Sequence, residues 1–137
     1  MQANGLLDAH NDTGCILYAD DQFINRQFLQ HTLSMLQLNE RFHTYPNGQM
    51  VLNAFDRILD IFASFSEADE ADQPQIVQPV SILFLDINMP VLDGLETARL
   101  IKQRVEDFNA KIHVSNPLLT VVRPLIVHLT QYDKTFK

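Results

Sequence analysis

The sequence predicts an α/β fold, a doubly wound parallel sheet whose strands alternate with amphipathic helices in the order β-α-β-α-β-α-β. The first observation is a pair of short apolar runs at 15–19 and 81–85, which is typical of strands covered on both faces. The second is that apolar side chains between the runs recur every three or four residues, as in amphipathic helices. This alternation predicts parallel pairing, right-handed crossovers and helices on both faces of the sheet.

The first half of the chain contains two predicted strands and two predicted helices. After the strand at 15–19 comes a helix with one apolar stripe, made of Ile24, Phe28, Leu29, Leu33, Met35 and Leu36. A weaker strand at 41–45 stops at the turn sequence Pro-Asn-Gly at 46–48. The second helix has an apolar face made of Val51, Phe55, Ile58, Leu59 and Phe62. The residues 66–79 are acidic and contain two prolines, which predicts a solvated loop.

The second half begins with the clearest buried strand, at 81–86, and a loop at 87–94 separates this strand from a third helix. The inward face of that helix is predicted to hold Leu95, Ala98, Ile101, Val105 and Phe108. We predict an irregular stretch at 109–123, whose apolar part at 117–122 either covers an exposed sheet edge or adds a strand. The fourth strand is predicted at 124–130.

Length, charge and composition restrict the class of protein. The 137 residues are the size of one domain, which we place at 15–137 behind a polar, flexible segment at 1–14. The formal charge of −7 argues against a nucleic-acid partner, which needs a clustered basic face. No apolar run approaches the ~20 residues of a membrane span, and no signal peptide is recognisable, so we expect a cytoplasmic protein without a membrane partner. The single cysteine, Cys15, permits no internal disulfide and is expected to be buried and inert.

Four polar residues stand at the carboxyl ends of predicted strands: Asp20, Asp21, Asp86 and Thr130. Open parallel sheets bind their ligands at this edge. Three crowded carboxylates repel one another unless a cation neutralises them, and Mg²⁺ prefers hard oxygen ligands. We therefore predict an acidic Mg²⁺ pocket that handles a phosphoryl group, with Asp86 as nucleophile, Asp21 as direct ligand and Asp20 as ligand through water. The hydroxyl of Thr130 would donate a hydrogen bond to a phosphoryl oxygen.

A simpler interpretation of the aspartates stays open, because Asp is common in turns and at helix N-termini. Either Asp20 or Asp21 alone could cap the helix that opens near Gln22. The repetition is harder to explain as capping, since two apolar strands end in Asp and another ends in Thr.

Three segments together resemble the response-regulator receiver domain of two-component phosphorelays, which has a flavodoxin-like, CheY-like fold. They are Ile-Leu-Tyr-Ala-Asp-Asp at 16–21, the strand and loop at 83–94, and Pro-Leu-Ile-Val-His-Leu-Thr at 124–130. The pattern D-x-x-M-P-x-x-D-G within the second segment is the most specific part. Its last residue, Gly94, is expected to adopt a backbone conformation closed to other residues.

The resemblance implies a function and a set of site residues. Asp86 would accept a phosphoryl group from a histidine kinase or a histidine phosphotransfer domain. Asp20, Asp21 and Asp86 would hold Mg²⁺ together with the backbone carbonyl of Asn88. The hydroxyl of Thr130 would move toward the phosphoryl group and start the conformational switch.

The chain departs from the family at its C-terminal end. The family has a fifth strand, further helices and a lysine after that strand, whereas Lys134 and Lys137 follow no fifth strand here. The residue after the family's threonine is usually small and leaves the phosphoryl group a way in, but here it is Gln131, followed by Tyr132, and either side chain could narrow the entrance. We therefore expect an incomplete receiver domain that is marginally stable, forms a homodimer through its exposed sheet edge, or is a fragment.

Two other functions compete with the phosphoacceptor. A degenerate receiver would be a docking or dimerisation module that works without phosphorylation, and Gln131 and the missing lysine favour it. A phosphatase of the haloacid-dehalogenase type would need an Asp two positions after its nucleophile, where this chain has Asn88. We expect no turnover enzyme, because the domain would catalyse at most its own phosphorylation. The five histidines share no metal-ligand spacing, and His128 is expected inside a buried strand.

Overall fold

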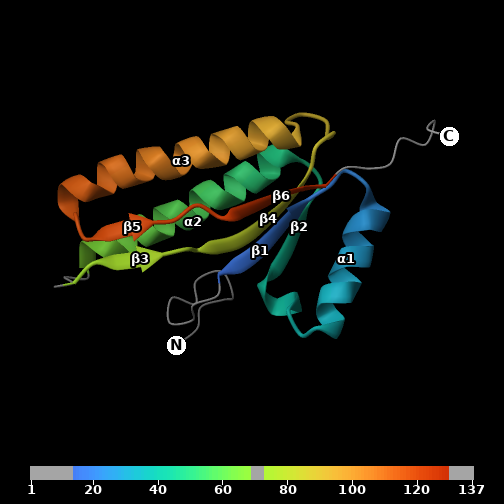
Figure 1. The fold of residues 1–137 in the computed structure, drawn as a ribbon, viewed down its shortest axis with the longest axis horizontal. Coiled ribbons are helices and arrows are strands. Elements are labelled where there is room, and N and C mark those ends of the chain that lie inside the picture. The colour runs from blue at the N-terminus through green and yellow to red at the C-terminus, as the bar shows by residue number, and fades with distance from the viewer. Residues whose placement is uncertain (1–13, 69–72, 130–137) are drawn as a thin grey trace.

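The computed structural model of the protein describes residues 14–68 and 73–129 (Figure 1). In these residues the strands and helices follow one another as β1 (Cys15–Ala19), α1 (Phe23–Met35), the short 3₁₀ helix η2 (Asn39–Arg41), β2 (Phe42–Tyr45), α2 (Gly48–Ala68), β3 (Gln75–Val77), β4 (Val80–Asp86), α3 (Gly94–Ser115), β5 (Leu119–Val121) and β6 (Leu125–Leu129). The predicted flexible segment at 1–14, apart from Gly14, and the last residue of the predicted strand at 124–130 lie outside the described residues.

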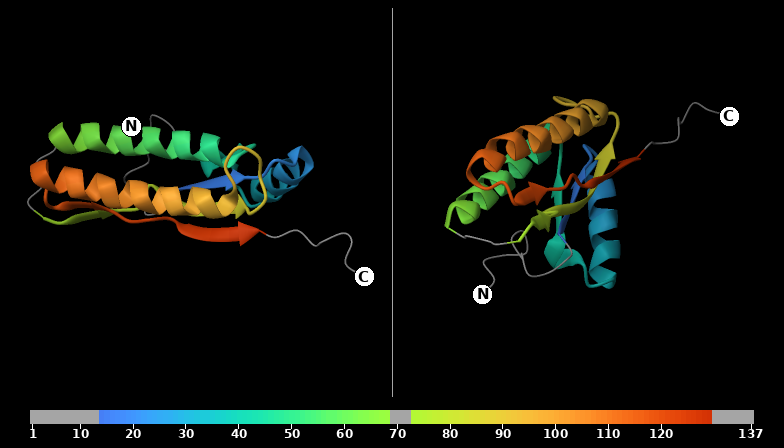
Figure 2. Two further views of the ribbon diagram at one scale, coloured as in Figure 1. Left: turned by 90° about the horizontal axis from the view of Figure 1, so that it is seen from above. Right: turned by 60° about the vertical axis from the view of Figure 1, so that its left-hand side comes forward.

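The main sheet has four parallel strands in the order β2-β1-β4-β6. Helices α2 and α3 cover one face of this sheet and α1 covers the other, as the different views show (Figures 1 and 2). The predicted doubly wound, parallel α/β fold is therefore confirmed. Because all strands run the same way, the carboxyl ends of β1 and β4 lie side by side at one edge of the sheet.

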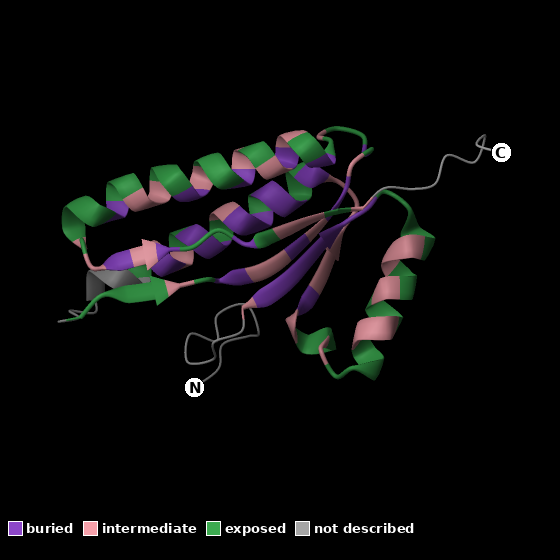
Figure 3. Cartoon of the chain, viewed as in Figure 1, coloured by how far each residue is buried: buried purple, intermediate pink, exposed green. Residues whose placement is uncertain are grey.

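The core divides between the two faces of the sheet, because side chains alternate along each strand. Strand β1 is buried along its length, whereas α1 has no fully buried residue (Figure 3). On the side of α2 and α3, the largest fully buried side chains come from two strands and two helices: Leu17, Val51, Phe55, Ile58, Leu83, Leu85 and Ile101. On the side of α1, a smaller cluster consists of Ile16, Tyr18 and Phe42. The two clusters cover β1 and β4 on both faces.

The segment that was predicted to be irregular, 109–123, is ordered, and this prediction was wrong. Helix α3 continues to Ser115, since Ile112 extends the inward spacing of Ile101 and Val105 by two more turns. Strand β5 follows and pairs in parallel with β3, so one of the two predicted alternatives, an added strand, is confirmed. Strand β3 leads into β4, and β5 leads into β6. Pro79 and Pro124 lie at these two junctions and separate the two-stranded β3–β5 sheet from the main sheet, because proline has no backbone N–H to donate.

Asn109 joins the end of α3 to β5 through two hydrogen bonds. Its Nδ2 donates to the carbonyl of Val121, and the backbone N–H of Val121 donates to its Oδ1, both at 2.9 Å. The amide side chain thus pairs with the strand as a neighbouring backbone would. This contact fixes the long helix over the β3–β5 extension.

Helix α1 differs from the prediction of one inward apolar stripe. Leu29 and Leu33 pack against the sheet, but Ile24, Phe28 and Met35 are each 73% exposed. The spacing explains the division, because at 100° per residue these three lie on the side of the helix opposite Leu29 and Leu33. One helix on one sheet face can bury only one of these two stripes.

Strands β2 and β6 form the two edges of the main sheet. His128, which was expected inside a buried strand, is exposed on β6, because no strand of the described residues lies outside β6. Among the described helices, none has an apolar stretch long enough to cross a membrane.

Candidate functional site

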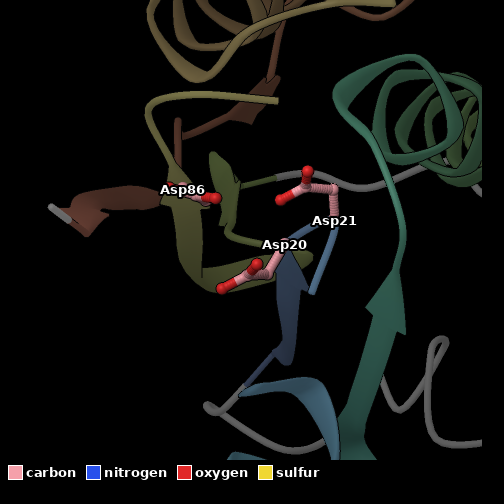
Figure 4. A group of neighbouring side chains, drawn as sticks. All are labelled: Asp20, Asp21 and Asp86. Atoms are coloured by element: carbon pink, nitrogen blue, oxygen red, sulfur yellow. The ribbon is translucent and has the colours of Figure 1, made fainter. Parts of the chain in front are cut away.

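Three carboxylates meet at the carboxyl ends of β1 and β4 (Figure 4). Asp20 and Asp21 follow the last residue of β1, and Asp86 is the last residue of β4. One oxygen of each lies within 4.8 Å of the others. Asp20 and Asp86 are buried, with 3% and 4% of their surfaces exposed, and Asp21 is exposed to solvent. The sequence predicted this cluster, and the structure brings its three members together.

The pKa of Asp86 is raised from 3.8 to about 6, mainly because burial disfavours the charged carboxylate. The negative charge of Asp20 raises it further, and a weaker contribution comes from Asp21. The backbone N–H of Asn88 donates a hydrogen bond to Asp86 and acts in the opposite direction. Asp86 is thus a carboxylate that lacks a neutralising cation among its described neighbours.

Asp20 is held by several hydrogen bonds. Its Oδ2 accepts from the Tyr18 hydroxyl at 2.6 Å and from Nδ2 of Asn25 at 3.2 Å, while its Oδ1 accepts from the backbone N–H of Gln22 at 2.8 Å. The hydrogen bond from Gln22 forms a local turn at Asp20, as expected if this aspartate has a structural role in a turn or at a helix start. The bond from Tyr18 links the core beneath α1 to the acidic cluster.

Tyr18 and Asn25 are parts of the site that were not predicted. A signal for Tyr18 was present, because residues two apart in a strand lie on the same face. A tyrosine inside an apolar strand, two residues before Asp20, therefore has its hydroxyl within reach of that carboxylate. No comparable signal existed for Asn25, whose position depends on how α1 is oriented at the end of β1.

The loop from β4 to α3 folds back closely on Asp86. The N–H of Gly94 donates to the carbonyl of Ile87 at 2.9 Å, and a Cβ at Gly94 would collide with the backbone carbonyl of Asp86. The prediction that Gly94 adopts a special backbone conformation was wrong, since its φ is not positive. Glycine is needed here because the backbone approaches closely. The residue with a positive φ in this loop is Val91, at 70°.

Asp93 begins helix α3 as its N-cap. Its carboxylate accepts a hydrogen bond from the N–H of Glu96 at 2.8 Å. The buried hydroxyl of Thr97 donates to the carbonyl of Asp93 at 2.7 Å and lies against Gly48, where a Cβ would collide with it. The Asp-Gly pair of the motif is therefore the start of a helix that is locked to α2, and the loop beside Asp86 is anchored at this end.

Two predicted site residues are not placed in the cluster. Thr130 lies outside the described residues, as do Gln131, Tyr132, Lys134 and Lys137. Asn88 is exposed and next to the site, and its contact with Asp86 is made through its N–H. The role of its carbonyl as a metal ligand stays a prediction.

Cys15 and His43 are titratable groups that lie away from the cluster. Cys15 is fully buried, and burial raises the pKa of its thiol to about 12, so the expected buried and unreactive cysteine is present. Burial lowers the pKa of His43 on β2, whose Nε2 has no hydrogen-bond partner among the described residues.

The donor set fits Mg²⁺. The ion binds oxygen ligands, keeps several waters, and uses one or two carboxylates together with phosphate oxygens. Asp21 is exposed and faces the cluster, so it can bind the ion directly, and Asp86 has a raised pKa that a cation would relieve. Asp20 has both oxygens occupied by hydrogen bonds, which suits a ligand that acts through water.

Comparison with solved structures gives the fold. The response regulator TrrA of Thermotoga maritima, in complex with Mg²⁺-BeF, is 22% identical over 88% of this chain and 72% of that chain, with a TM-score of 0.52. The receiver domain of the histidine kinase CKI1 of Arabidopsis thaliana, complexed with Mg²⁺ and BeF₃⁻, is 22% identical over 88% of this chain and 67% of that chain, with a TM-score of 0.60.

A third structure contains the Saccharomyces cerevisiae phosphotransfer protein Ypd1 and the receiver domain of the response regulator Ssk1. It is 20% identical over 90% of this chain and 67% of the matched chain, with a TM-score of 0.53. No family model and no curated protein matches the sequence. The structural likeness, together with the parallel sheet and the position of the acidic cluster, shows that this chain has the fold of response-regulator receiver domains.

Proposed function

We propose that this protein is a phosphoacceptor receiver domain in a cytoplasmic two-component phosphorelay, with Asp86 as the residue that is phosphorylated. The observation that carries the proposal is the cluster of Asp20, Asp21 and Asp86 at the carboxyl edge of the sheet, within 4.8 Å of one another. A buried carboxylate beside two others, at the ligand-binding edge of such a sheet, is suited to a phosphoryl group and a cation.

In the proposed reaction an oxygen of the Asp86 carboxylate attacks the phosphorus of a phosphohistidine on a kinase or a phosphotransfer domain. A phosphorus–oxygen bond forms as the phosphorus–nitrogen bond breaks, and the electron pair leaves with the imidazole, which takes up a proton. The product is an aspartyl phosphate. The domain catalyses only this change in itself and turns over no separate substrate.

The metal would be held by Asp20, Asp21 and Asp86 with the carbonyl of Asn88. Bound there, Mg²⁺ would neutralise the crowded negative charge of the carboxylates and the incoming phosphoryl oxygens. The hydrogen bond from Asn88 N–H orients Asp86, and those from Tyr18 and Gln22 orient Asp20. In this proposal the Thr130 hydroxyl donates to a phosphoryl oxygen after transfer.

The solved structures support the proposal by analogy. Two of the proteins with this fold are described with Mg²⁺ and a beryllium fluoride, and a third is described together with a histidine phosphotransfer protein. A partner of the same chemistry, a phosphohistidine-bearing domain, is what Asp86 would need here.

The test is the mass of the intact protein after incubation with Mg²⁺ and acetyl phosphate. We expect one phosphoryl adduct, which requires Mg²⁺ and is absent in Asp86→Asn. The matched control is Asp93→Asn, because Asn is also a good N-cap and Asp93 lies in the same loop outside the cluster. An adduct that persists in Asp86→Asn, or no adduct in a folded sample, would overturn the proposal.

A specific observation favours a second function, a docking module that works without phosphorylation. Both oxygens of Asp20 are occupied by hydrogen bonds, so the cluster is partly satisfied without a metal. The two functions differ in their need for Mg²⁺. A docking module would be equally stable with and without the ion, whereas a phosphoacceptor should be stabilised by it.

A further inference from the structure

We propose that Arg26 is a positioning residue of the acidic site. Its guanidinium fixes the peptide group that joins Asp20 to Asp21 and thereby aims the Asp21 carboxylate into the cluster. The inference rests on the proposed function, because the role has a purpose only if Asp21 is a metal ligand. It goes beyond that function by adding a residue of α1 that acts through Asp21 without touching the ion.

The Asp21 carboxylate has no contact of its own that would hold it in place. Within residues 14–68 and 73–129 it forms no hydrogen bond and no ion pair. Asp21 is exposed, yet its carboxylate faces Asp86 (Figure 4). The direction of its Cα–Cβ bond therefore depends on the backbone, which has only two soft dihedral angles per residue.

Both peptide groups that flank Asp21 are anchored. On one side, the carbonyl of Asp20 accepts a hydrogen bond from Nη1 of Arg26 at 2.6 Å. On the other side, the N–H of Gln22 donates to Oδ1 of Asp20 at 2.8 Å. The N–H of Asp20 in turn donates to the carbonyl of Tyr45 at 3.1 Å, so the chain that enters this turn is held as well. Because each peptide group is planar, an anchor on either side of Asp21 fixes its two dihedral angles.

The guanidinium of Arg26 is itself kept in place. It lies 5.6 Å from the centre of the Phe23 ring, which is three residues earlier on α1. Helical side chains lean toward the N-terminus of their helix, and the cation–π contact holds the guanidinium along this path. Arg26 is partly buried and forms no ion pair within the described residues. Its charge-assisted hydrogen bond is thus directed at the backbone of Asp20.

Without Arg26 the peptide group after Asp20 would lose its partner. Asp20 is only 3% exposed, and an unpaired carbonyl in a buried setting is costly. We expect this peptide group to rotate toward solvent, which turns the Cα–Cβ bond of Asp21 away from Asp86. The ligand would then have to be reoriented each time an ion binds.

A purely electrostatic role of Arg26 predicts the opposite effect on metal binding. The positive guanidinium repels a divalent cation, so removal of the charge alone would strengthen Mg²⁺ binding. Loss of orientation would weaken it, because residues that orient a metal ligand commonly contribute about tenfold or more to metal affinity. The sign of the change in affinity therefore separates the two roles.

The test is calorimetric titration of the full chain with Mg²⁺. Arg26→Met keeps a long side chain beside Phe23 but removes the charge and the donors, and its Kd should be about tenfold higher than that of wild type. Arg26→Lys keeps the charge and a donor, so its affinity should lie between those of wild type and Arg26→Met. Circular dichroism would verify folding. If Arg26→Met does not fold, the comparison of Arg26→Lys with wild type decides.

The matched control is Arg104→Met. Arg104 also makes one side-chain hydrogen bond, from its Nε to Asp56 at 3.0 Å, but this contact joins α3 to α2 and lies outside the acidic cluster. The substitution removes the same charge and a comparable hydrogen bond. It should leave the Mg²⁺ affinity nearly unchanged, because solvent and salt screen a distant surface charge.

A second readout separates metal binding from phosphorylation. With acetyl phosphate, Arg26→Met should need more Mg²⁺ than wild type to form the phosphoryl adduct. At saturating Mg²⁺ it should reach the wild-type rate, because Asp86 and its hydrogen bond from Asn88 are untouched. A merely destabilised protein would not show a defect that saturating Mg²⁺ removes.

Three results would overturn the role of Arg26 and leave the phosphoacceptor function standing. These are an Mg²⁺ affinity in Arg26→Met equal to or higher than that of wild type, an equal loss of affinity in Arg104→Met, and a phosphorylation rate that stays low at saturating Mg²⁺. The last would mean that Arg26 acts on the phosphoryl group. If wild type itself binds no Mg²⁺, the proposed function fails and the role of Arg26 fails with it, which the wild-type titration alone reveals.

Discussion

The hydroxyl of Tyr18 donates a 2.6 Å hydrogen bond to Oδ2 of Asp20, and both groups are buried. This bond connects the apolar cluster under α1 with the acidic cluster at the edge of the sheet. Tyr18 stacks near Phe42 and meets Phe84 edge-on, so its ring is fixed by the core. The position of Asp20 is consequently set by packing deep in the domain.

Tyr18→Phe should therefore weaken Mg²⁺ binding. The ring stays packed, but Asp20 loses its strongest orienting partner. Loss of a hydrogen-bonding partner of a metal ligand costs roughly tenfold in metal affinity, and loss of a buried hydrogen bond costs about 1 kcal/mol of stability. Calorimetric titration with Mg²⁺ measures the first effect and urea unfolding the second. Tyr45→Phe, on β2, is the control because its hydroxyl is not part of the cluster. Equal Mg²⁺ affinity in wild type and Tyr18→Phe would contradict this role.

The raised pKa of Asp86 predicts a pH-dependent stability in the absence of Mg²⁺. The folded carboxyl, with a pKa of about 6, holds its proton more tightly than the unfolded one at 3.8. Its stabilising contribution is therefore fully present below pH 3.8 and is lost as the pH rises through about 6. At about 1.4 kcal/mol per pKa unit, the loss is roughly 2–3 kcal/mol.

The measurement is the free energy of unfolding of wild type and Asp86→Asn between pH 4 and 8, in EDTA and in Mg²⁺. In EDTA the wild type should lose stability relative to Asp86→Asn as the pH rises, so that the variant is the more stable at pH 8. Mg²⁺ should restore the wild type and leave the variant almost unchanged. A constant difference in unfolding free energy between the two proteins across this pH range would show that the pKa of Asp86 is not raised in the folded state.

Much of the fold and of the acidic cluster could be predicted, because both depend on local patterns. A buried strand such as β4 shows itself as an apolar run, and parallel pairing then brings Asp86 to the same edge as Asp20 and Asp21. The three aspartates of the cluster could be named from the positions where two predicted strands end, without knowledge of how side chains pack.

The features that could not be predicted depend on tertiary contacts. The sequence of α1 has two apolar stripes, and only the packing shows that Leu29 and Leu33 face the sheet. The need for glycine at Gly94 arises from the nearby carbonyl of Asp86 and has no local conformational signature. The double hydrogen bond between Asn109 and Val121 joins residues whose relation depends on where α3 ends.

Gly94→Ala should disturb the site through the backbone. The added Cβ would collide with the carbonyl of Asp86, so the loop or the end of β4 must shift. We expect a loss of about 1–3 kcal/mol in unfolding free energy and a weaker Mg²⁺ response. Leu95→Ala is the control for the same turn of α3, because Leu95 is 57% exposed. A stability for Gly94→Ala equal to that of Leu95→Ala, with unchanged Mg²⁺ binding, would show that the loop accommodates the methyl group.

Asn109→Ala should release β5 from α3 while leaving the acidic cluster intact. The substitution removes both hydrogen bonds to Val121, whose backbone N–H and carbonyl then lose these partners in a partly buried setting. The cost should be about 1–3 kcal/mol. It should appear as faster hydrogen exchange at Val121 and its neighbours in β5, with unchanged Mg²⁺ affinity. Gln103→Ala, which removes an exposed hydrogen bond to Asp107 on the same helix, should change stability by less than about 0.5 kcal/mol. If exchange at Val121 stays as slow as in wild type, β5 is held by its pairing with β3 and by the apolar contacts of Leu119 and Val121, and the amide of Asn109 contributes little.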